Sequence, residues 1–182
     1  MKDPAELRKG FTTGTCVATC ARIAYRVLKN GVEEVDSESV LFPDGLRREI
    51  AVESVEYSDN KASAQVIKDA GDDPDVTDKA RISAKVSIDG TYTPDPRDHN
   101  FRLENSTVIV TVDSGIGVAT RDGLDVAKGK WAINPGPIRM ITDNLKEVGC
   151  GLEKETVVVS VKVKAGETIA KKTLNFTLGI EG

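Results

Sequence analysis

The residues best suited to chemistry lie in one short acidic segment, residues 68–77, which contains the four aspartates Asp69, Asp72, Asp73 and Asp75. A glycine and a proline interrupt the run, which excludes a helix interior and a central strand and predicts a turn. Clustered carboxylates repel one another unless a cation or backbone N–H groups offset their charge. The segment is therefore a candidate site facing something cationic. The alternative is a solvated turn, because Asp, Gly and Pro are ordinary turn residues.

A threonine-rich segment before an expected helix is a second candidate site. Apolar residues recur three and four apart through residues 16–30, which predicts an amphipathic helix capped by Thr13 or Thr15. The first N–H groups of a helix lack intrahelical partners and attract anions. No Lys-Ser/Thr pair follows the glycine, which excludes a Walker loop. The segment is a candidate carboxylate or phosphate site, or a capped helix end with nothing bound, and consists of Thr12, Thr13, Gly14 and Thr15.

Two segments in the second half of the chain are further candidates. Gly115 and Gly117 follow an expected strand and indicate close approach of the backbone to a ligand, but the third glycine and the helix of a dinucleotide fingerprint are absent. Asn134 is a candidate cap of a second helix, and Arg139 in its first turns is a candidate clamp for a carboxylate or phosphate. The alternative for Arg139 is an ordinary surface arginine.

The cysteines and the histidine are weaker candidates. Cys16 and Cys20 lie four apart on one helix face, with no histidine or second cysteine pair nearby, so we expect buried small apolar residues and no metal site. His99 is the single histidine and lies in the polar stretch 89–105. A catalytic triad or a two-histidine metal site is therefore not predicted.

Composition excludes several classes of protein. Aromatic residues make up 4% of the chain, too few for base-stacking platforms, and the net charge of −4 with no long basic run argues against nucleic-acid binding. No apolar stretch approaches the roughly 18 residues of a membrane helix, and the first residues lack the apolar core of a signal peptide. Three cysteines, an odd number, indicate a reducing cytoplasm rather than a disulfide framework.

The expected elements form one α+β domain over residues 1–182, a mostly antiparallel sheet with two main helices. Residues 1–10 are expected to be a mobile arm. The second helix is expected at 137–148, where apolar spacing follows a proline. Period-two or β-branched segments predict strands, namely a hairpin of 40–42 with 48–55, then 62–67, 80–88, 108–112 and 156–163.

Taken in order, these motifs resemble the CbiD family, the cobalt-precorrin-5B C1-methyltransferases of anaerobic cobalamin biosynthesis. The resemblance runs nearly end to end. It is carried by LRKGFTTGTC at 7–16, KDAGDDPDVT at 68–77, AINP at 132–135, the segment 166–175, and LGI at 178–180.

The resemblance implies methyl transfer from S-adenosylmethionine to ring carbon 1 of a cobalt corrinoid, a displacement that positioning alone can promote strongly. The many carboxylates of the macrocycle suit the segment 12–15, Asn134 and Arg139. The acidic turn would repel them, so it is expected to face a cation, either the donor's sulfonium or a Lys or Arg of the protein. Asp73 or Asp75 is the expected base. The residues assigned to the donor are Asp72, Gly115 and Gly117.

The chain also departs from the family's pattern. Family members continue beyond the position of Gly182 with a further domain, so a separate domain or chain is expected to complete the enzyme. Asp78 stands where the family often has histidine, and residues 175–177 read Asn-Phe-Thr in place of Asn-Pro-Arg. Two other hypotheses stay open: a non-catalytic corrinoid-binding module, and a Ca²⁺- or Mg²⁺-binding domain built on the acidic turn, which lacks the spacing of an EF-hand.

Overall fold

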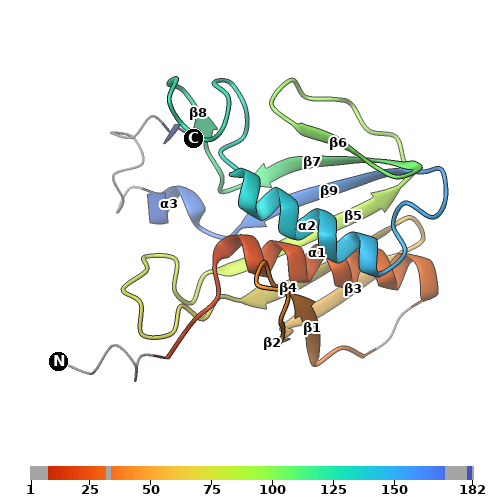
Figure 1. Ribbon diagram of the computed structural model, residues 1–182, viewed down its shortest axis with the longest axis horizontal. Coiled ribbons are helices and arrows are strands. Elements are labelled where there is room, and N and C mark those ends of the chain that lie inside the picture. The colour runs from red at the N-terminus through yellow and green to blue at the C-terminus, as the bar shows by residue number, and fades with distance from the viewer. Residues whose placement is uncertain (1–7, 32–33, 171–179, 182) are drawn as a thin grey trace.

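A curved six-stranded sheet forms the framework of the protein, as a computed structural model covering residues 8–31, 34–170 and 180–181 shows (Figure 1). Its strands lie in the order β3-β4-β5-β9-β7-β6. All neighbours pair antiparallel except β7 and β9, which are parallel. The expected α+β class is confirmed. The strands span β3 (Ser54–Ser58), β4 (Lys61–Ile67), β5 (Arg81–Ile88), β6 (His99–Leu103), β7 (Ser106–Ser114) and β9 (Thr156–Val163).

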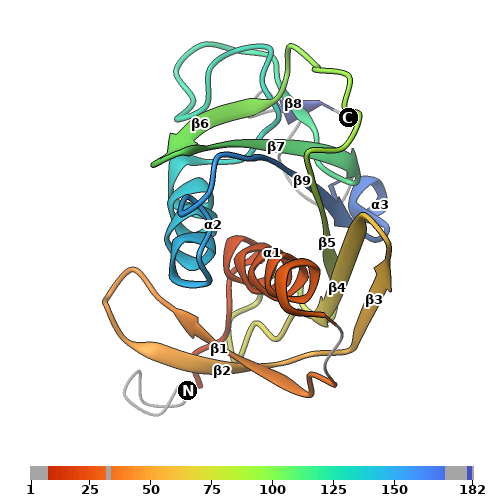
Figure 2. The same ribbon diagram turned by 90° about the vertical axis from the view of Figure 1, so that its right-hand side faces the viewer.

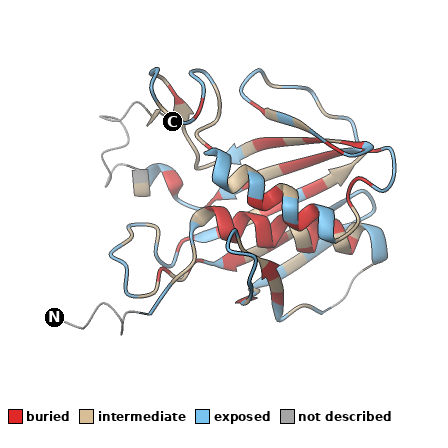
Figure 3. Ribbon diagram, viewed as in Figure 1, coloured by how far each residue is buried: buried red, intermediate tan, exposed pale blue. Residues whose placement is uncertain are grey.

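Two helices fill the concave face of this sheet. Helix α1 (Thr13–Asn30) lies in the curve, and α2 (Pro135–Glu147) lies beside it with its start at the same end (Figure 2). Alternation along β4 and β5 turns one side chain in two toward the helices, which gives the buried inner face seen in Figure 3. Among the described residues, no helix is both long and apolar enough to cross a membrane.

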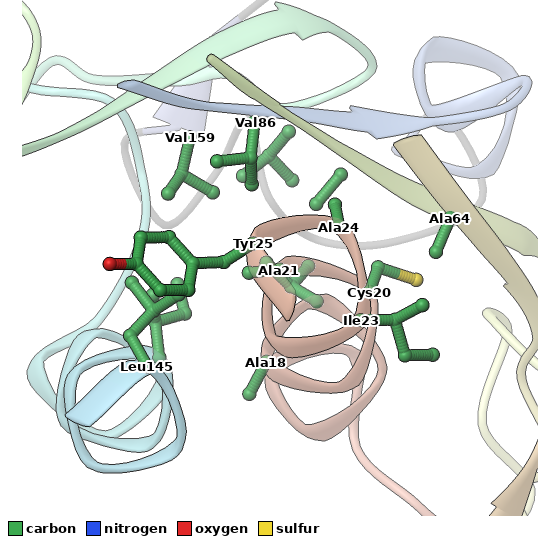
Figure 4. Packing of buried hydrophobic residues seen from close by; sticks show 14 of the residues in the cluster. Ala18, Cys20, Ala21, Ile23, Ala24, Tyr25, Ala64, Val86, Leu145 and Val159 are labelled. Atoms are coloured by element: carbon green, nitrogen blue, oxygen red, sulfur yellow. The ribbon is translucent and has the colours of Figure 1, made fainter. Parts of the chain in front are cut away.

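Small side chains let α1 approach the sheet closely. The inner face of α1 carries alanines and cysteines, with valines and alanines opposite them on the strands (Figure 4). All three cysteines are free and buried, and burial raises the pKa of the Cys16 thiol to about 12. Buried thiols of this kind pack as small apolar groups, as the sequence indicated. The fully buried apolar residues of α1 include Cys16, Ala18, Cys20, Ala21, Ile23 and Ala24.

A separate hairpin, β1 (Ser37–Leu41) with β2 (Arg47–Ala51), covers the helices opposite the sheet. Its main polar anchor is Glu38, which is 7% exposed and accepts hydrogen bonds from Arg22 at 2.6 Å and Arg26 at 2.7 Å on α1. The remaining elements are short: α3 (Gly166–Ala170), and β8 (Val118–Ala119) paired with β10 (Ile180–Glu181).

Three expectations about elements are wrong. The strand expected over 48–55 is two strands, because Val52 donates to Asp36 and Glu53 donates to Gln65, which passes the chain from the hairpin to the main sheet. The polar stretch 89–105 contains β6, an edge strand with one half-buried face. Helix α1 begins earlier than expected and is capped by Thr12, whose hydroxyl accepts from the backbone of residue 15 at 3.1 Å.

Candidate functional site

The motifs singled out in the sequence converge at one end of the molecule. Strands β4, β7 and β9 end there, and helices α1 and α2 begin there (Figure 1). The acidic turn connects β4 to β5 at this end, beside the extended residues 8–12 that lead into α1. Segments far apart in the sequence therefore share one surface.

The extended residues 8–12 are bound to the acidic turn through their backbone. Lys9 pairs with Gly71 as an antiparallel bridge, Phe11 donates to the Asp69 carbonyl at 2.7 Å, and Asp72 donates to the carbonyl of residue 8 at 2.9 Å. A Cβ on Gly10 would lie 2.0 Å from the Ala70 carbonyl carbon, so glycine is required at this contact. The mobile arm expected over residues 1–10 is thus wrong for 8–10, and residues 1–7 lie outside the described part.

Two cations of the protein neutralise two of the turn's carboxylates. The Arg8 guanidinium donates to both oxygens of Asp69, at 2.5 and 2.7 Å, and these bonds lower the pKa of that carboxyl. Arg8 comes from the extended segment, 61 positions away in sequence. This ion pair is largely exposed, so it fixes geometry more than it stabilises the fold.

The second cation is Lys68, which is 1% exposed and donates to Asp75 and Thr77. Asp75 also accepts from the backbone N–H of Thr77 at 2.7 Å and from its hydroxyl at 2.6 Å. Partial burial raises the pKa of Asp75, but the hydrogen bonds from Lys68 and Thr77 outweigh burial and bring the pKa down to about 2. A carboxylate held in this way is a poor proton acceptor near neutral pH.

Asp73 has a different environment from Asp69 and Asp75. It is exposed, and within the described part of the chain its carboxylate has no hydrogen-bond or ion-pair partner. It lines a hollow of about 510 Å³ between the acidic turn and the extended segment. Of the carboxylates that line this hollow, Asp73 is therefore unpaired among the described residues, whereas Asp72 and Asp75 are hydrogen-bonded. Its lining is Arg8, Lys9, Gly10, Phe11, Thr12, Ala70, Asp72, Asp73, Pro74 and Asp75.

A second, smaller hollow of about 160 Å³ lies between the starts of the two helices. Thr12 borders the first hollow and Thr13 the second, so the start of α1 separates the two. As the first residues of α1, half-buried Thr13 and buried Gly14 have N–H groups without an acceptor inside the helix, and both residues line this hollow. Asn134 precedes α2, and its side chain makes no cap hydrogen bond. The lining is Thr13, Gly14, Val17, Ile116, Ala132, Ile133, Asn134, Pro137, Ile141 and Val161.

The glycine pair at 115 and 117 contacts the chain's own backbone. A Cβ on Gly115 would lie 2.0 Å from the Val163 carbonyl oxygen, and the φ of Gly115 is 80°. The Gly117 carbonyl accepts from the Ala132 N–H at 2.8 Å. The close approach at Gly115 is between the ends of β7 and β9, where the sequence predicted approach to a ligand, and Ile116 beside it lies in the wall of the smaller hollow.

Two of the predicted binding residues lie away from the hollows. Thr15 is 2% exposed and its hydroxyl lies 2.9 Å from that of Thr12, so it belongs to the helix cap. Arg139 is exposed on α2, two positions from Pro137 and Ile141, which puts it on the opposite side of the helix from the hollow they line. In the described residues Arg139 has no ion-pair partner.

Sequence reasoning missed Arg8 and Lys68 as members of the site. Both lie inside motifs that carried the family resemblance, at 7–16 and 68–77, and membership of those motifs was the sequence signal that could have identified them as site residues. Among the residues described, no group of three or more His, Cys, Asp or Glu side chains is arranged to hold a metal ion.

The chain is similar in sequence to known proteins of one family. The profile of the CbiD family matches residues 1–182. A cobalt-precorrin-5B C(1)-methyltransferase of Pelobacter propionicus is 41% identical over 97% of this chain and 42% of its own length. One of Geobacter sulfurreducens is 40% identical over 97% of this chain and 47% of its own length.

A solved structure is also similar. The crystal structure of the cobalamin biosynthesis protein cbiD from Archaeoglobus fulgidus superposes with a TM-score of 0.64 at 27% identity, over 97% of this chain and 50% of that one. The chain thus spans about half the length of the relatives it matches. On the match of the family profile over residues 1–182, the chain belongs to the CbiD family.

Proposed function

We propose that this chain takes part in methyl transfer from S-adenosylmethionine to ring carbon 1 of cobalt-precorrin-5B, in the cytoplasm. The observation that carries the proposal is the convergence of the segments around Thr12, Asp73 and Asn134 on two adjoining hollows. The relatives named for this reaction match over 97% of the chain. We further propose that a separate domain or chain completes the enzyme.

We assign the methyl donor to the larger hollow. Arg8 and Lys68 neutralise Asp69 and Asp75, which leaves Asp73 as the carboxylate with no cation of the described residues beside it. An unpaired carboxylate attracts the positive sulfonium of the donor and repels the carboxylates of the corrinoid. Asp72, also in this lining, is held by the backbone N–H of Arg8 at 3.2 Å and forms the adjoining wall.

We assign the corrinoid to the surface around the smaller hollow. A macrocycle is too large for a space of about 160 Å³, so it would lie across the helix starts and send one peripheral group inward. The N–H groups of Thr13 and Gly14 suit a carboxylate there, as does the amide of Asn134. Gly115 and Gly117 would act indirectly, by shaping the wall that holds Ile116. Arg139 would reach only a carboxylate at the edge of the ring.

The chemistry asked of the protein is modest. Methyl transfer is an in-line displacement, so bringing the donor's methyl group and the ring carbon into line where the two hollows adjoin would supply much of the rate. If a proton must leave the ring after methylation, Asp73 is better suited to accept it than Asp75, because Lys68 and Thr77 already hydrogen-bond the Asp75 carboxylate.

Calorimetric titration of S-adenosylmethionine into the chain tests the donor assignment. We expect saturable binding, weakened about tenfold in Asp73→Asn because the charge facing the sulfonium is lost. The matched control is Asp59→Asn, which removes the same charge from an exposed turn between β3 and β4. No binding by the folded chain would contradict a donor site here and favour a corrinoid-binding module without catalysis. Equal weakening by both variants would contradict the role of Asp73.

A further inference from the structure

Lys68 is a buried lysine at the base of the acidic turn. It follows the last residue of β4, and its backbone closes the loop 69–79: its N–H donates to Ala80 at 2.9 Å, and its carbonyl accepts from Lys79 at 2.8 Å. Its side chain is 1% exposed, an uncommon state for a lysine. Burial of an ammonium is costly unless the group is paired and hydrogen-bonded.

The loop is folded around this ammonium. Lys68 donates to Asp75 and to Thr77, and Thr77 in turn donates its N–H and hydroxyl to the second oxygen of Asp75. The Asp75 N–H donates to the Asp73 carbonyl at 2.8 Å, so the tethered aspartate is bound directly to the free one. The position of the Asp73 backbone is thus connected to the lysine through two contacts.

The loop is also held by its contacts with residues 8–12 and by the Ala70 N–H, which donates to Asp78 at 2.9 Å. Most residues from 72 to 79 are exposed, so the loop has no apolar core of its own. Lys79, at its base, has a φ of 62°, a left-handed conformation that a non-glycine residue keeps only when its surroundings hold it there. The polar contacts inside the loop are the source of that constraint.

We propose that Lys68 is a positioning residue of the candidate donor site: by holding Asp75, it fixes the turn so that Asp73 is the carboxylate of the larger hollow without an ion-pair partner among the described residues. This inference rests on the proposed function for its ligand. The cationic partners anticipated for the acidic turn are then of two kinds, the protein's own Arg8 and Lys68 and the sulfonium of the donor. Each of these cations is met by a different carboxylate of the turn.

The test compares three variants of the 182-residue chain. Lys68→Met removes the buried ammonium. Lys68→Met with Asp75→Asn removes both charges, so that no partly buried carboxylate is left without its cation. Lys79→Met is the matched control, because it removes an exposed ammonium from the same loop, 3.8 Å from Asp78. Amide hydrogen exchange at Thr77 and Asp72, urea unfolding and S-adenosylmethionine titration are measured for each.

In Lys68→Met we expect exchange at Thr77 to accelerate about tenfold or more and donor binding to weaken about tenfold, as for loss of a hydrogen bond to a charged group. The double variant should regain urea stability but not donor binding, a split that a merely structural role would not give. The control should match wild type. A double variant that binds like wild type, or unchanged exchange in Lys68→Met, would overturn the proposal. If the wild-type chain does not bind S-adenosylmethionine, the proposed donor site is wrong. Amide exchange at Thr77 in Lys68→Met would then still show whether Lys68 fixes the turn.

Discussion

The contact at Gly10 offers a direct test of how the candidate site is assembled. Gly10→Ala would place a Cβ 2.0 Å from the Ala70 carbonyl carbon and 2.4 Å from the Gly71 nitrogen, both of them backbone atoms that cannot rotate away. The extended segment must therefore move off the acidic turn. Two backbone hydrogen bonds are lost with that movement, from Phe11 to Asp69 and from Asp72 to Arg8.

Each of those bonds contributes about 0.5–1.5 kcal/mol, so the free energy of unfolding should fall by about 2 kcal/mol. For a chain of this length that corresponds to a decrease in Tm of roughly 4–8 °C. Urea unfolding measures the change in stability. Amide exchange at Asp72 reports separately whether the two segments have come apart.

Gly136→Ala is the control for the Gly10 variant. Its Cβ would meet nothing within 4 Å, and it lies in the first turn of α2, so the substitution should raise stability by about 0.5–1 kcal/mol. If Gly10→Ala unfolds at the wild-type urea concentration and Asp72 keeps its protection from exchange, the contact between the extended segment and the turn is not as described.

Two further predictions concern charge. Glu38→Gln leaves two arginines without their buried carboxylate and should lower the free energy of unfolding by about 3 kcal/mol in urea titrations. Glu104→Gln, the control at an exposed pair with Lys146, should lower it by less than about 1 kcal/mol. Equal effects of the two variants would refute the contribution of burial. The pKa of Asp75 is lowered to about 2, below its usual ~3.9, so its ionised form stabilises the fold above about pH 4 and that stabilisation is lost as pH falls toward 2. Between pH 5 and pH 2, wild type should lose about 1–2 kcal/mol more than Asp75→Asn, allowing for solvent screening, and parallel pH profiles would contradict the ion pair.

Periodicity predicted most of the elements well. Helix α1, helix α2 and strands β4, β5 and β9 have one buried face each or β-branched content throughout, so their sequences carry a clear signal. The strand expected over 48–55 was wrong because β2 and β3 keep the period-two pattern while they change sheets. Strand β6 was missed because an edge strand reading His-Asn-Phe-Arg-Leu is polar on one face and resembles a loop.

The sequence predicted the carboxylates of the candidate site, but it did not predict which cations of the protein pair with them. The acidic turn was evident from composition alone, but the partner of Asp69 lies 61 positions earlier in the chain, and no local pattern reports such a contact. Lys68 lay inside the motif, yet a lysine is expected at the surface, and its burial follows only from the closure of the loop around it. The glycines at 115 and 117 predicted close approach to a ligand, whereas Gly115 lies against the end of β9 and Gly117 accepts from Ala132.

The place of β9 in the sheet also bears on how the chain folds as it is made. Strand β9 lies between β5 and β7, yet it is the last of the six strands to be synthesised. Until β9 has left the ribosome, the edges of β5 and β7 that it joins in the finished sheet have no strand between them. Unpaired strand edges are sites of aggregation. The order of synthesis therefore leaves two strand edges of the nascent chain open to wrong pairing until a single late strand joins them.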